Sequence, residues 1–328
     1  MNTSRIRVLA TGGTIAGSGG SAFGSGYSPG QIAAEDMLRE VKSLGIDAEL
    51  DAVEIASIGS QDIDWPVWDR LHAEVVRAQA DDAICGIIIT HGTDTAEETA
   101  LLLDQTLEPG KPVILVGAMR PADAVGSDGM RNFANAVRVA SDPASRDRGV
   151  LVVMGDTIFA ARDVRKAATS NIDAFKGFPR GPLGRVTPST LDWFGPAART
   201  GEKARFAWPE KLPRVAILIA GAGMDAQPVE ALLGIGCQGI VLAGMGQGNA
   251  PRCVLDALQQ AAAAGVPVVR SSRVDEGLVD RNVEVDDDAR GFIAARSLGP
   301  AKSRILLMLL LASGITDPAA IQQAFDKP

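Results

Sequence analysis

Runs of β-branched and apolar residues alternate with helical patterns along this chain, and this alternation constrains the fold more than any other feature. In the first half, strand-like runs begin at Arg5, Ala52, Ala83, Pro112 and Gly149, and helix-like segments lie between several of them. Parallel strands need long crossover connections, which helices usually supply. The pattern therefore predicts an α/β protein with parallel layers of strands and helices.

A second and shorter set of patterns follows an irregular polar stretch, "LDWFGPAARTGEKARFAWPEKLP". Beyond it, "RVAILIAGA", "QGIVLAGMG" and "PVVRS" are strand-like, and the segments between them are helix-like. A chain of 328 residues is long enough for two moderate domains. We predict an N-terminal domain over residues 1–190, a linker over 191–213 and a smaller C-terminal α/β domain over 214–328.

Two helix starts can be recognised from capping patterns. Asp64 followed by Pro66 is typical of an N-cap with proline in the first turn. Thr95 with Glu98 three residues later forms a capping-box pattern. We expect helices to begin directly after Asp64 and Thr95.

The chain is acidic and contains no block of basic residues. Its 32 Lys and Arg against 40 Asp and Glu give a net charge of −8, so nucleic acid is not an expected partner. The longest apolar run, 305–312, is far shorter than the about 20 residues that a membrane-spanning helix needs. The first residues pass into a strand pattern without the apolar stretch of a secretory signal. We expect a cytoplasmic protein without a membrane partner.

Histidine is scarce, which restricts the available mechanisms. The chain has only His72 and His91, so a His-rich metal site cannot be built. A Ser-His-Asp relay would have to use one of these two. His72 lies in a helix-like segment, and His91 stands beside Gly92 in a tight turn, where we expect a structural role.

The loops that follow the strands are the expected place for chemistry, because ligands of open α/β sheets bind at the carboxyl ends of the strands. In the N-terminal half these loops contain "TGGTIAG", "GSQD", "HGTDT" and "MRPADAVGSDG". The first is part of a glycine-rich stretch, residues 10–30, that lacks the lysine of a Walker A motif. The stretch offers a close backbone approach at Gly12 and Gly13, the Thr14 hydroxyl, and Tyr27, the chain's single tyrosine. We interpret Tyr27 as part of an active-site lid; the alternative is a surface loop with an incidental aromatic residue.

"HGTDT" is the sharpest local feature. Taken alone, Asp94 would be a helix N-cap and Thr93 a turn residue. Thr14, however, follows another strand in the same way, so two hydroxyls can face one crevice. A threonine hydroxyl needs a proton acceptor to become a nucleophile, and lysine can serve where histidine is scarce. Lys166 in "ARDVRKAAT" is a candidate, although that segment alone is typical of a charged, solvated stretch.

Together these segments resemble bacterial L-asparaginases with two threonine motifs. The similarity is carried by "LATGGTIAG", "IGSQD", "ITHGTDTAEET", "GAMRP", "RGVLVVMGDT", "ARDVRK", "AGMGQGN" and "EVDDDARGF", and it spans nearly the whole chain. The resemblance implies a large flavodoxin-like N-terminal domain with a mixed sheet and a smaller C-terminal α/β domain with a parallel sheet. It also implies a homotetramer whose active sites lie between subunits, and it requires no metal or organic cofactor.

The resemblance assigns a role to each matching position. It makes Thr14 the primary nucleophile, with Tyr27 helping to activate it, and makes Thr93, Asp94 and Lys166 the group that activates water. A rival account gives the covalent attack to the second threonine, and the sequence leaves both open. The substrate-binding residues implied are Ser60, Gln61 and Asp94, with Asn249 and Glu284 from a neighbouring subunit.

The resemblance further implies hydrolysis of L-asparagine to L-aspartate and ammonia through a threonine acyl-enzyme. The dipeptide Ser60-Gln61 and "GAMRP" favour asparagine, since relatives that prefer glutamine tend to have Glu after the serine. Three alternatives remain: a glutaminase-asparaginase with broad amide use, a non-catalytic amino-acid sensor on the same fold, and a nucleotide-binding α/β protein.

Overall fold

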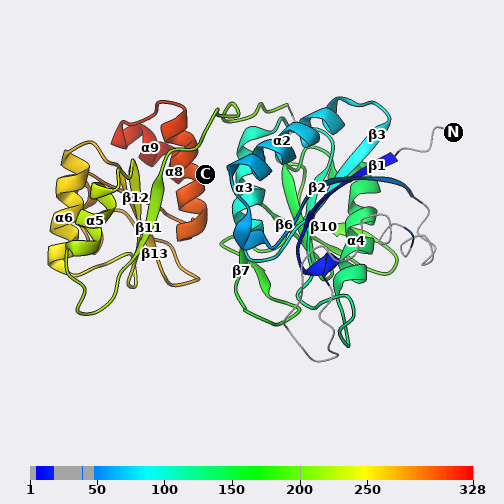
Figure 1. The fold of residues 1–328 in the computed structure, drawn as a ribbon, viewed down its shortest axis with the longest axis horizontal. Coiled ribbons are helices and arrows are strands. Elements are labelled where there is room, and N and C mark those ends of the chain that lie inside the picture. Colours follow the sequence, from blue (N-terminus) through cyan, green and yellow to red (C-terminus); the bar gives the residue numbers. More distant parts are fainter. Residues whose placement is uncertain (1–4, 18–38, 40–47, 200, 328) are drawn as a thin grey trace. The chain divides into compact units, whose positions relative to one another are not determined.

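A computed structural model of the chain describes residues 5–17, 39, 48–199 and 201–327. The chain divides into two units, Met1–Arg205 and Phe206–Pro328 (Figure 1). Each unit contains its own β-sheet with helices packed on both faces. This α/β architecture confirms the fold class that the alternating patterns predicted.

The first unit is built on an eight-stranded mixed sheet with the strand order β10-β9-β6-β5-β4-β3-β1-β2. Strands β2, β1, β3, β4 and β5 are parallel, which is the flavodoxin-like order 2-1-3-4-5. Strands β6, β9 and β10 extend the sheet antiparallel beyond β5, and β7 pairs with β8 in a separate ribbon. The strands are β1 (Arg5–Gly12), β2 (Glu49–Ile58), β3 (Ile84–Thr90), β4 (Val113–Val116), β5 (Val150–Met154), β6 (Thr157–Ala160), β7 (Val164–Lys166), β8 (Phe175–Gly177), β9 (Gly184–Val186) and β10 (Leu191–Trp193).

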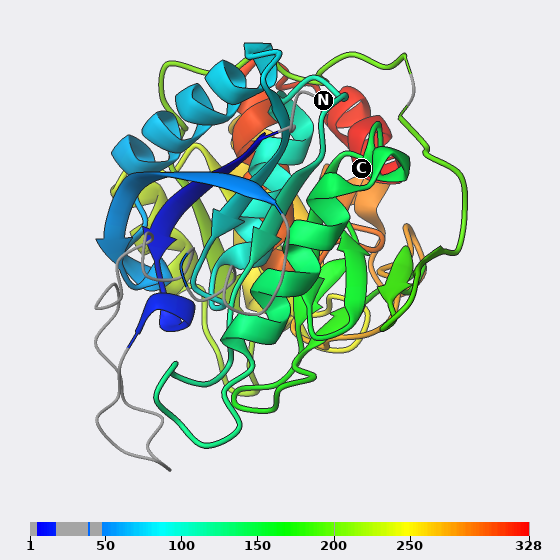
Figure 2. The same cartoon turned by 90° about the vertical axis from the view of Figure 1, so that its right-hand side faces the viewer.

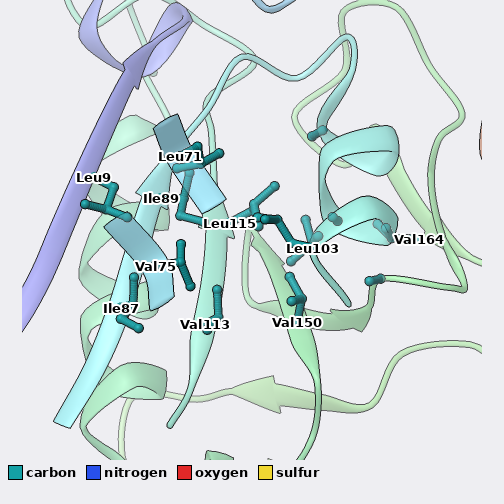
Figure 3. Close-up of a cluster of buried hydrophobic side chains, with 14 of the residues drawn as sticks. Leu9, Leu71, Val75, Ile87, Ile89, Leu103, Val113, Leu115, Val150 and Val164 are labelled. Carbon is teal, nitrogen blue, oxygen red and sulfur yellow. The ribbon is translucent and has the colours of Figure 1, made fainter. Parts of the chain in front are cut away.

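Both faces of this sheet are buried, which explains why the central strands are continuous apolar runs. Helices α2 (Trp65–Ala80) and α3 (Ala96–Thr106) cover one face, and α4 (Gly129–Ser141) covers the other (Figure 1 and Figure 2). Figure 3 shows Leu9, Ile87 and Ile89 of the strands in one apolar cluster with Leu71 and Val75 of α2. Residues between them in the sequence point to the α4 side because side chains alternate along a strand.

One of the two predicted helix caps is present, and the other is not. Asp64 caps α2, because its side chain accepts a hydrogen bond from Val67 N at 3.2 Å. Thr95 stands at the N-cap position of α3, but its side chain makes no capping bond. Its hydroxyl donates instead to the Ser60 carbonyl at 2.8 Å. The predicted start of the helix after Thr95 is confirmed, but the Thr95 side chain does not cap it, because a contact with a distant loop takes the hydroxyl away from the helix end.

The second unit is a four-stranded parallel sheet in the order β11-β12-β13-β14. Helices α5 and α6 lie on one face and α8 on the other (Figure 1). Within the part of the chain that the structure describes, no helix has the length and hydrophobicity of a membrane span. The elements are β11 (Val215–Ile219), α5 (Gln227–Gly234), β12 (Gly239–Gly244), α6 (Arg252–Ala263), β13 (Val268–Ser272), α7 (Asp287–Arg290), β14 (Phe292–Ala294), α8 (Pro300–Ala312) and α9 (Pro318–Asp326).

The segment predicted as a linker, residues 191–213, starts within the first unit. Its first three residues form β10, the edge strand of the large sheet. The residues that follow are tied to the first unit as well: Arg199 donates to Asp104 at 3.1 Å, and Arg205 N donates to the Gln105 carbonyl at 3.1 Å. These contacts explain why the boundary between the units falls after Arg205.

Candidate active site

The loops after β1, β2, β3 and β4 meet at the carboxyl edge of the large sheet, and glycines make this contact possible. A Cβ added at Gly13 would lie 2.5 Å from Gly92 N, and one at Gly92 would lie 2.7 Å from Ser60 Oγ. A Cβ at Gly117, after β4, would lie 2.6 Å from the His91 carbonyl oxygen. No real Cβ fits at such distances, so these loops are in direct contact through their glycines.

Thr14 begins the 3₁₀ helix η1 (Thr14–Ala16) directly after β1. The turn that carries it uses Gly12 and Gly13 with φ of +100° and +80°, a region that favours glycine. Gly13 N donates to the Ile58 carbonyl at 3.0 Å, which ties the turn to the end of β2. Thr14 is buried, at 6% exposure, and it directly follows Gly13, which contacts Gly92.

Thr93, Asp94 and Lys166 form one hydrogen-bonded group. Lys166 ends β7, and its Nζ donates to Thr93 Oγ1 at 2.9 Å and to Asp94 Oδ1 at 2.5 Å. Thr93 is 7% exposed, while the Asp94 side chain is 59% exposed and open to a ligand. A hydroxyl in direct contact with an amine, which is itself paired with a carboxylate, is an arrangement that can transfer a proton.

Ser60 and Gln61 lie in the 3₁₀ helix η2 (Ser60–Asp62), after β2. Ser60 is 3% exposed and contacts the loop after β3 through Gly92 and through the hydroxyl of Thr95. Gln61 is exposed, and its Nε2 donates to Asp62 Oδ2 at 3.1 Å. Thr95 therefore links the two loops that hold Ser60 and Thr93.

His91 has the structural role that its place in the turn predicted. Its Nδ1 lies 2.6 Å from the Gly92 carbonyl, which can only accept, so Nδ1 carries the proton. Nε2 then accepts from the Thr99 hydroxyl at 2.9 Å, and Thr99 Oγ1 accepts from Trp68 Nε1 at 2.9 Å. Burial lowers the pKa of His91 to about 4, which keeps the ring neutral. His91 therefore holds the turn in place.

Two residues outside the predicted set organise the loop after β4. The Asp128 carboxylate accepts from Met119 N at 3.0 Å and from Arg120 N at 3.0 Å. Asn132 Nδ2 donates to Asp128 Oδ2 and to the Gly117 carbonyl, both at 2.9 Å. "MRPADAVGSDG" marked this loop in the sequence, but nothing local indicated that Asp128 closes it across nine residues.

Asn249 and Glu284 belong to the second unit and contact one another there. Asn249 Nδ2 donates to Glu284 Oε2 at 3.1 Å, although 35 positions separate them in the sequence. Both lie in loops at the carboxyl side of the smaller sheet, after β12 and after β13. Tyr27 lies outside the residues that the structure describes, so its interpretation as a lid residue stays a prediction.

Family models match both units of the chain. Residues 5–199 match the model described as "Asparaginase, N-terminal", and residues 214–325 match "Glutaminase/Asparaginase C-terminal domain". Together they span the loops described above.

Full-length relatives agree with these matches. The chain is 44% identical over 324 residues to "Probable L-asparaginase periplasmic" of Haemophilus influenzae, covering 98% of this chain and 92% of the relative. It is 43% identical over 325 residues to "L-asparaginase 2" of Escherichia coli, with the same coverage of 98% and 92%. A "Glutaminase-asparaginase" of Pseudomonas fluorescens is 38% identical over 325 residues, 98% of this chain and 89% of the relative. The chain therefore belongs to the L-asparaginase family and is an asparaginase-family amidohydrolase.

Proposed function

We propose that this protein hydrolyses L-asparagine to L-aspartate and ammonia through a threonine acyl-enzyme. The observation that carries the proposal is the group formed by Thr93, Asp94 and Lys166, in which one amine lies 2.9 Å from a buried hydroxyl and 2.5 Å from a carboxylate. The turn that holds Thr14 packs directly against the turn that holds Thr93. This arrangement supports a reaction that needs two hydroxyls and no imidazole.

In the first half of the proposed reaction, Thr14 Oγ attacks the side-chain amide carbon of asparagine. The hydroxyl proton passes to a base, for which Tyr27 is our candidate, and then to the leaving nitrogen. The C–N bond breaks, ammonia leaves, and a β-aspartyl ester remains on Thr14. Backbone N–H groups of the glycine-rich turns are candidates to stabilise the oxyanion, each contributing about 3 kcal/mol.

In the second half, water attacks the ester and frees L-aspartate. Lys166, hydrogen-bonded to Thr93 and oriented by Asp94, takes the proton from the water through the Thr93 hydroxyl. The rival assignment exchanges the two threonines, so that Thr93 carries the ester. Identifying the residue that becomes acylated separates the two accounts.

Substrate binding requires an anion for the α-ammonium and donors for the α-carboxylate. We assign the ammonium to Asp94 and to Glu284 of a neighbouring subunit, with Asn249 beside it. Ser60 and Gln61 are assigned to the carboxylate. The exposed Asp94 carboxylate and the contact between Asn249 and Glu284 support these roles.

Preference for asparagine over glutamine is the finer part of the proposal. Relatives carry both names, L-asparaginase and glutaminase-asparaginase. One methylene group changes discrimination by only about 1–3 kcal/mol, so a glutaminase-asparaginase with broad amide use is the second candidate. Ammonia release measured on L-asparagine, L-glutamine and their D-isomers tests both, and the ratio of kcat/KM for the two L-amides decides between them. A chain that binds aspartate but releases no ammonia would instead be an amino-acid sensor.

A homotetramer with active sites between subunits, and a cytoplasmic location, complete the proposal. One relative is named as periplasmic, which makes location a question for cell fractionation. A periplasmic fraction that holds the protein would refute the cytoplasmic assignment without changing the proposed chemistry.

A further inference from the structure

Arg270 is a fully buried arginine on β13 that joins two loops of the second unit. Its Nε donates to Asp287 Oδ1 at 2.8 Å and its Nη2 to Asp287 Oδ2 at 2.7 Å, with both side chains 0% exposed. The same guanidinium donates from Nη1 to the Gln247 carbonyl and from Nη2 to the Asp280 carbonyl at 2.8 Å. One side chain therefore binds the loop after β12 and the segment 280–287 together.

The loop after β12 is shaped around Arg270. Gly248 has φ of +84°, and a Cβ there would lie 2.8 Å from Arg270 Cγ. Met245 and Asn249 exchange two backbone hydrogen bonds of 2.7 Å, which close the loop. Ser272 Oγ donates to the Gly246 carbonyl at 2.6 Å and holds the loop from the end of β13. Asn249 is thus set in a closed loop that packs on the arginine.

The segment 280–287 is closed in a similar way. Asn282 has φ of +58°, its N–H donates to Asp287 Oδ2 at 2.9 Å, and its Oδ1 accepts from Asp287 N at 2.8 Å. Glu284 lies inside this closed segment, where its carboxylate accepts from Asn249. The carboxylate that pairs with Arg270 therefore also fixes the backbone that carries Glu284.

We propose that the Arg270–Asp287 pair positions Asn249 and Glu284 for substrate binding. The proposal rests on the function proposed above, in which those two residues contact the α-amino end of the substrate. A buried ion pair is a poor source of stability, because desolvation offsets the attraction between the charges. Here the guanidinium also satisfies carbonyls of both loops, which is a geometric role that an apolar residue could not take.

The first test is Arg270→Lys, which keeps the charge but loses the bidentate fork and the donors to one or both loops. We expect KM for L-asparagine to rise about tenfold while kcat changes much less. The reason is that misplaced binding residues weaken the binding of substrate and of transition state equally. Val254→Ala is the matched control, because it removes apolar packing from α6 in the same unit. It should lower Tm without changing KM. An unchanged KM in a folded Arg270→Lys variant would overturn the proposal.

A double-mutant cycle then tests whether Arg270 acts through Glu284. If it does, Arg270→Lys combined with Glu284→Gln should raise KM no more than about twofold above Glu284→Gln alone. Fully additive effects would refute positioning. Should Arg270→Lys fail to fold, Ser272→Ala decides, since it leaves the buried ion pair intact and removes the hydroxyl that contacts the Gly246 carbonyl and Val274 N. A raised KM then supports the proposal, and an unchanged KM overturns it. A wild-type chain that releases no ammonia would refute the proposed function and this role together, whereas an active wild type with additive variants refutes this role alone.

Discussion

Lys166 contacts both Thr93 and Asp94, although 73 and 72 positions separate it from them. Its own segment, "ARDVRK", is so rich in charge that local pattern predicts a solvated stretch. Asp163 and Arg165 are instead 1% and 8% exposed, and Asp163 pairs with Arg180 at 2.7 Å. Such burial depends on distant partners, so the residues offered Lys166 only as one candidate proton acceptor, and the family resemblance alone grouped it with Thr93 and Asp94.

The two threonines should be needed for turnover but not for folding. We expect Thr14→Ala and Thr93→Ala each to lower kcat by about 10³-fold or more, because each removes a hydroxyl that takes part in the reaction. Thr190→Ala is the control, since Thr190 lies in an exposed turn before β10. Steady-state ammonia release and circular dichroism measure both properties. Near-normal kcat in either site variant would remove that threonine from the mechanism.

His91 should make the folded state less stable as the pH falls, because burial lowers its pKa to about 4 from an ordinary value of 6.5. The unfolded chain binds the proton first, so the stability that neutral His91 provides is complete above pH 6.5 and decreases toward pH 4. Between pH 7 and pH 5, this effect should lower the free energy of unfolding by about 2 kcal/mol.

Urea unfolding of wild type and His91→Asn over this pH range measures the effect. Asparagine can still donate to the Gly92 carbonyl but does not titrate, so its curve should be flatter. In the same variant, kcat should fall by less than the about 10²-fold expected when a general base is removed. Equal pH slopes in the two proteins would show that His91 does not titrate as described.

Among the helices and strands, the long and buried strands are the ones that the sequence predicted best. The runs beginning near Arg5, Ala83 and Gly149 were all confirmed as strands. Continuous runs of β-branched and apolar residues are typical of strands that are buried on both faces of a parallel sheet. Strands β6 to β10 have three or four residues each and were not predicted. These segments become strands because they pair with one another and with β5, and their own short sequences do not predict a strand.

The proposed site depends on close contacts between loops at glycines, and substitution of a glycine can test this dependence. Gly13→Ala combines a φ of +80° with a Cβ 2.5 Å from Gly92 N, whereas Gly155→Ala has a φ of +60° with nothing within 4 Å. We expect Gly155→Ala to cost about 1 kcal/mol and Gly13→Ala at least about 3 kcal/mol. Only Gly13→Ala should also lower kcat, because it displaces Thr14. Equal losses of stability and activity would mean that the close approach is not needed.

The chain folds as two units, each with a loop cluster at the carboxyl side of its own sheet. The first cluster contains the threonines, and the second contains Asn249 and Glu284. The family resemblance predicted that both clusters serve one site across a subunit contact. Neither strand patterns nor composition could predict this, because they describe a single chain.

Dilution should therefore lower activity steeply at the point where the subunits separate. In the proposed assembly, a monomer lacks the neighbouring Glu284 and binds the α-ammonium with Asp94 alone. Light scattering with ammonia release across a dilution series measures both quantities, and Glu284→Gln at high concentration gives the activity expected without that carboxylate. An active monomer would contradict the intersubunit site and leave the threonine chemistry in place.

In the proposed reaction, a threonine hydroxyl forms a covalent ester with the substrate. The most direct measurement is peptide mass mapping after wild-type protein and Lys166→Met are mixed with L-asparagine and quenched in acid within milliseconds to seconds. We predict one added aspartyl group on the peptide that contains Thr14, at higher occupancy in Lys166→Met because deacylation is slowed. The same label on Thr93 would exchange the roles of the two threonines. Rapid release of ammonia with no acyl group on either threonine would contradict the account.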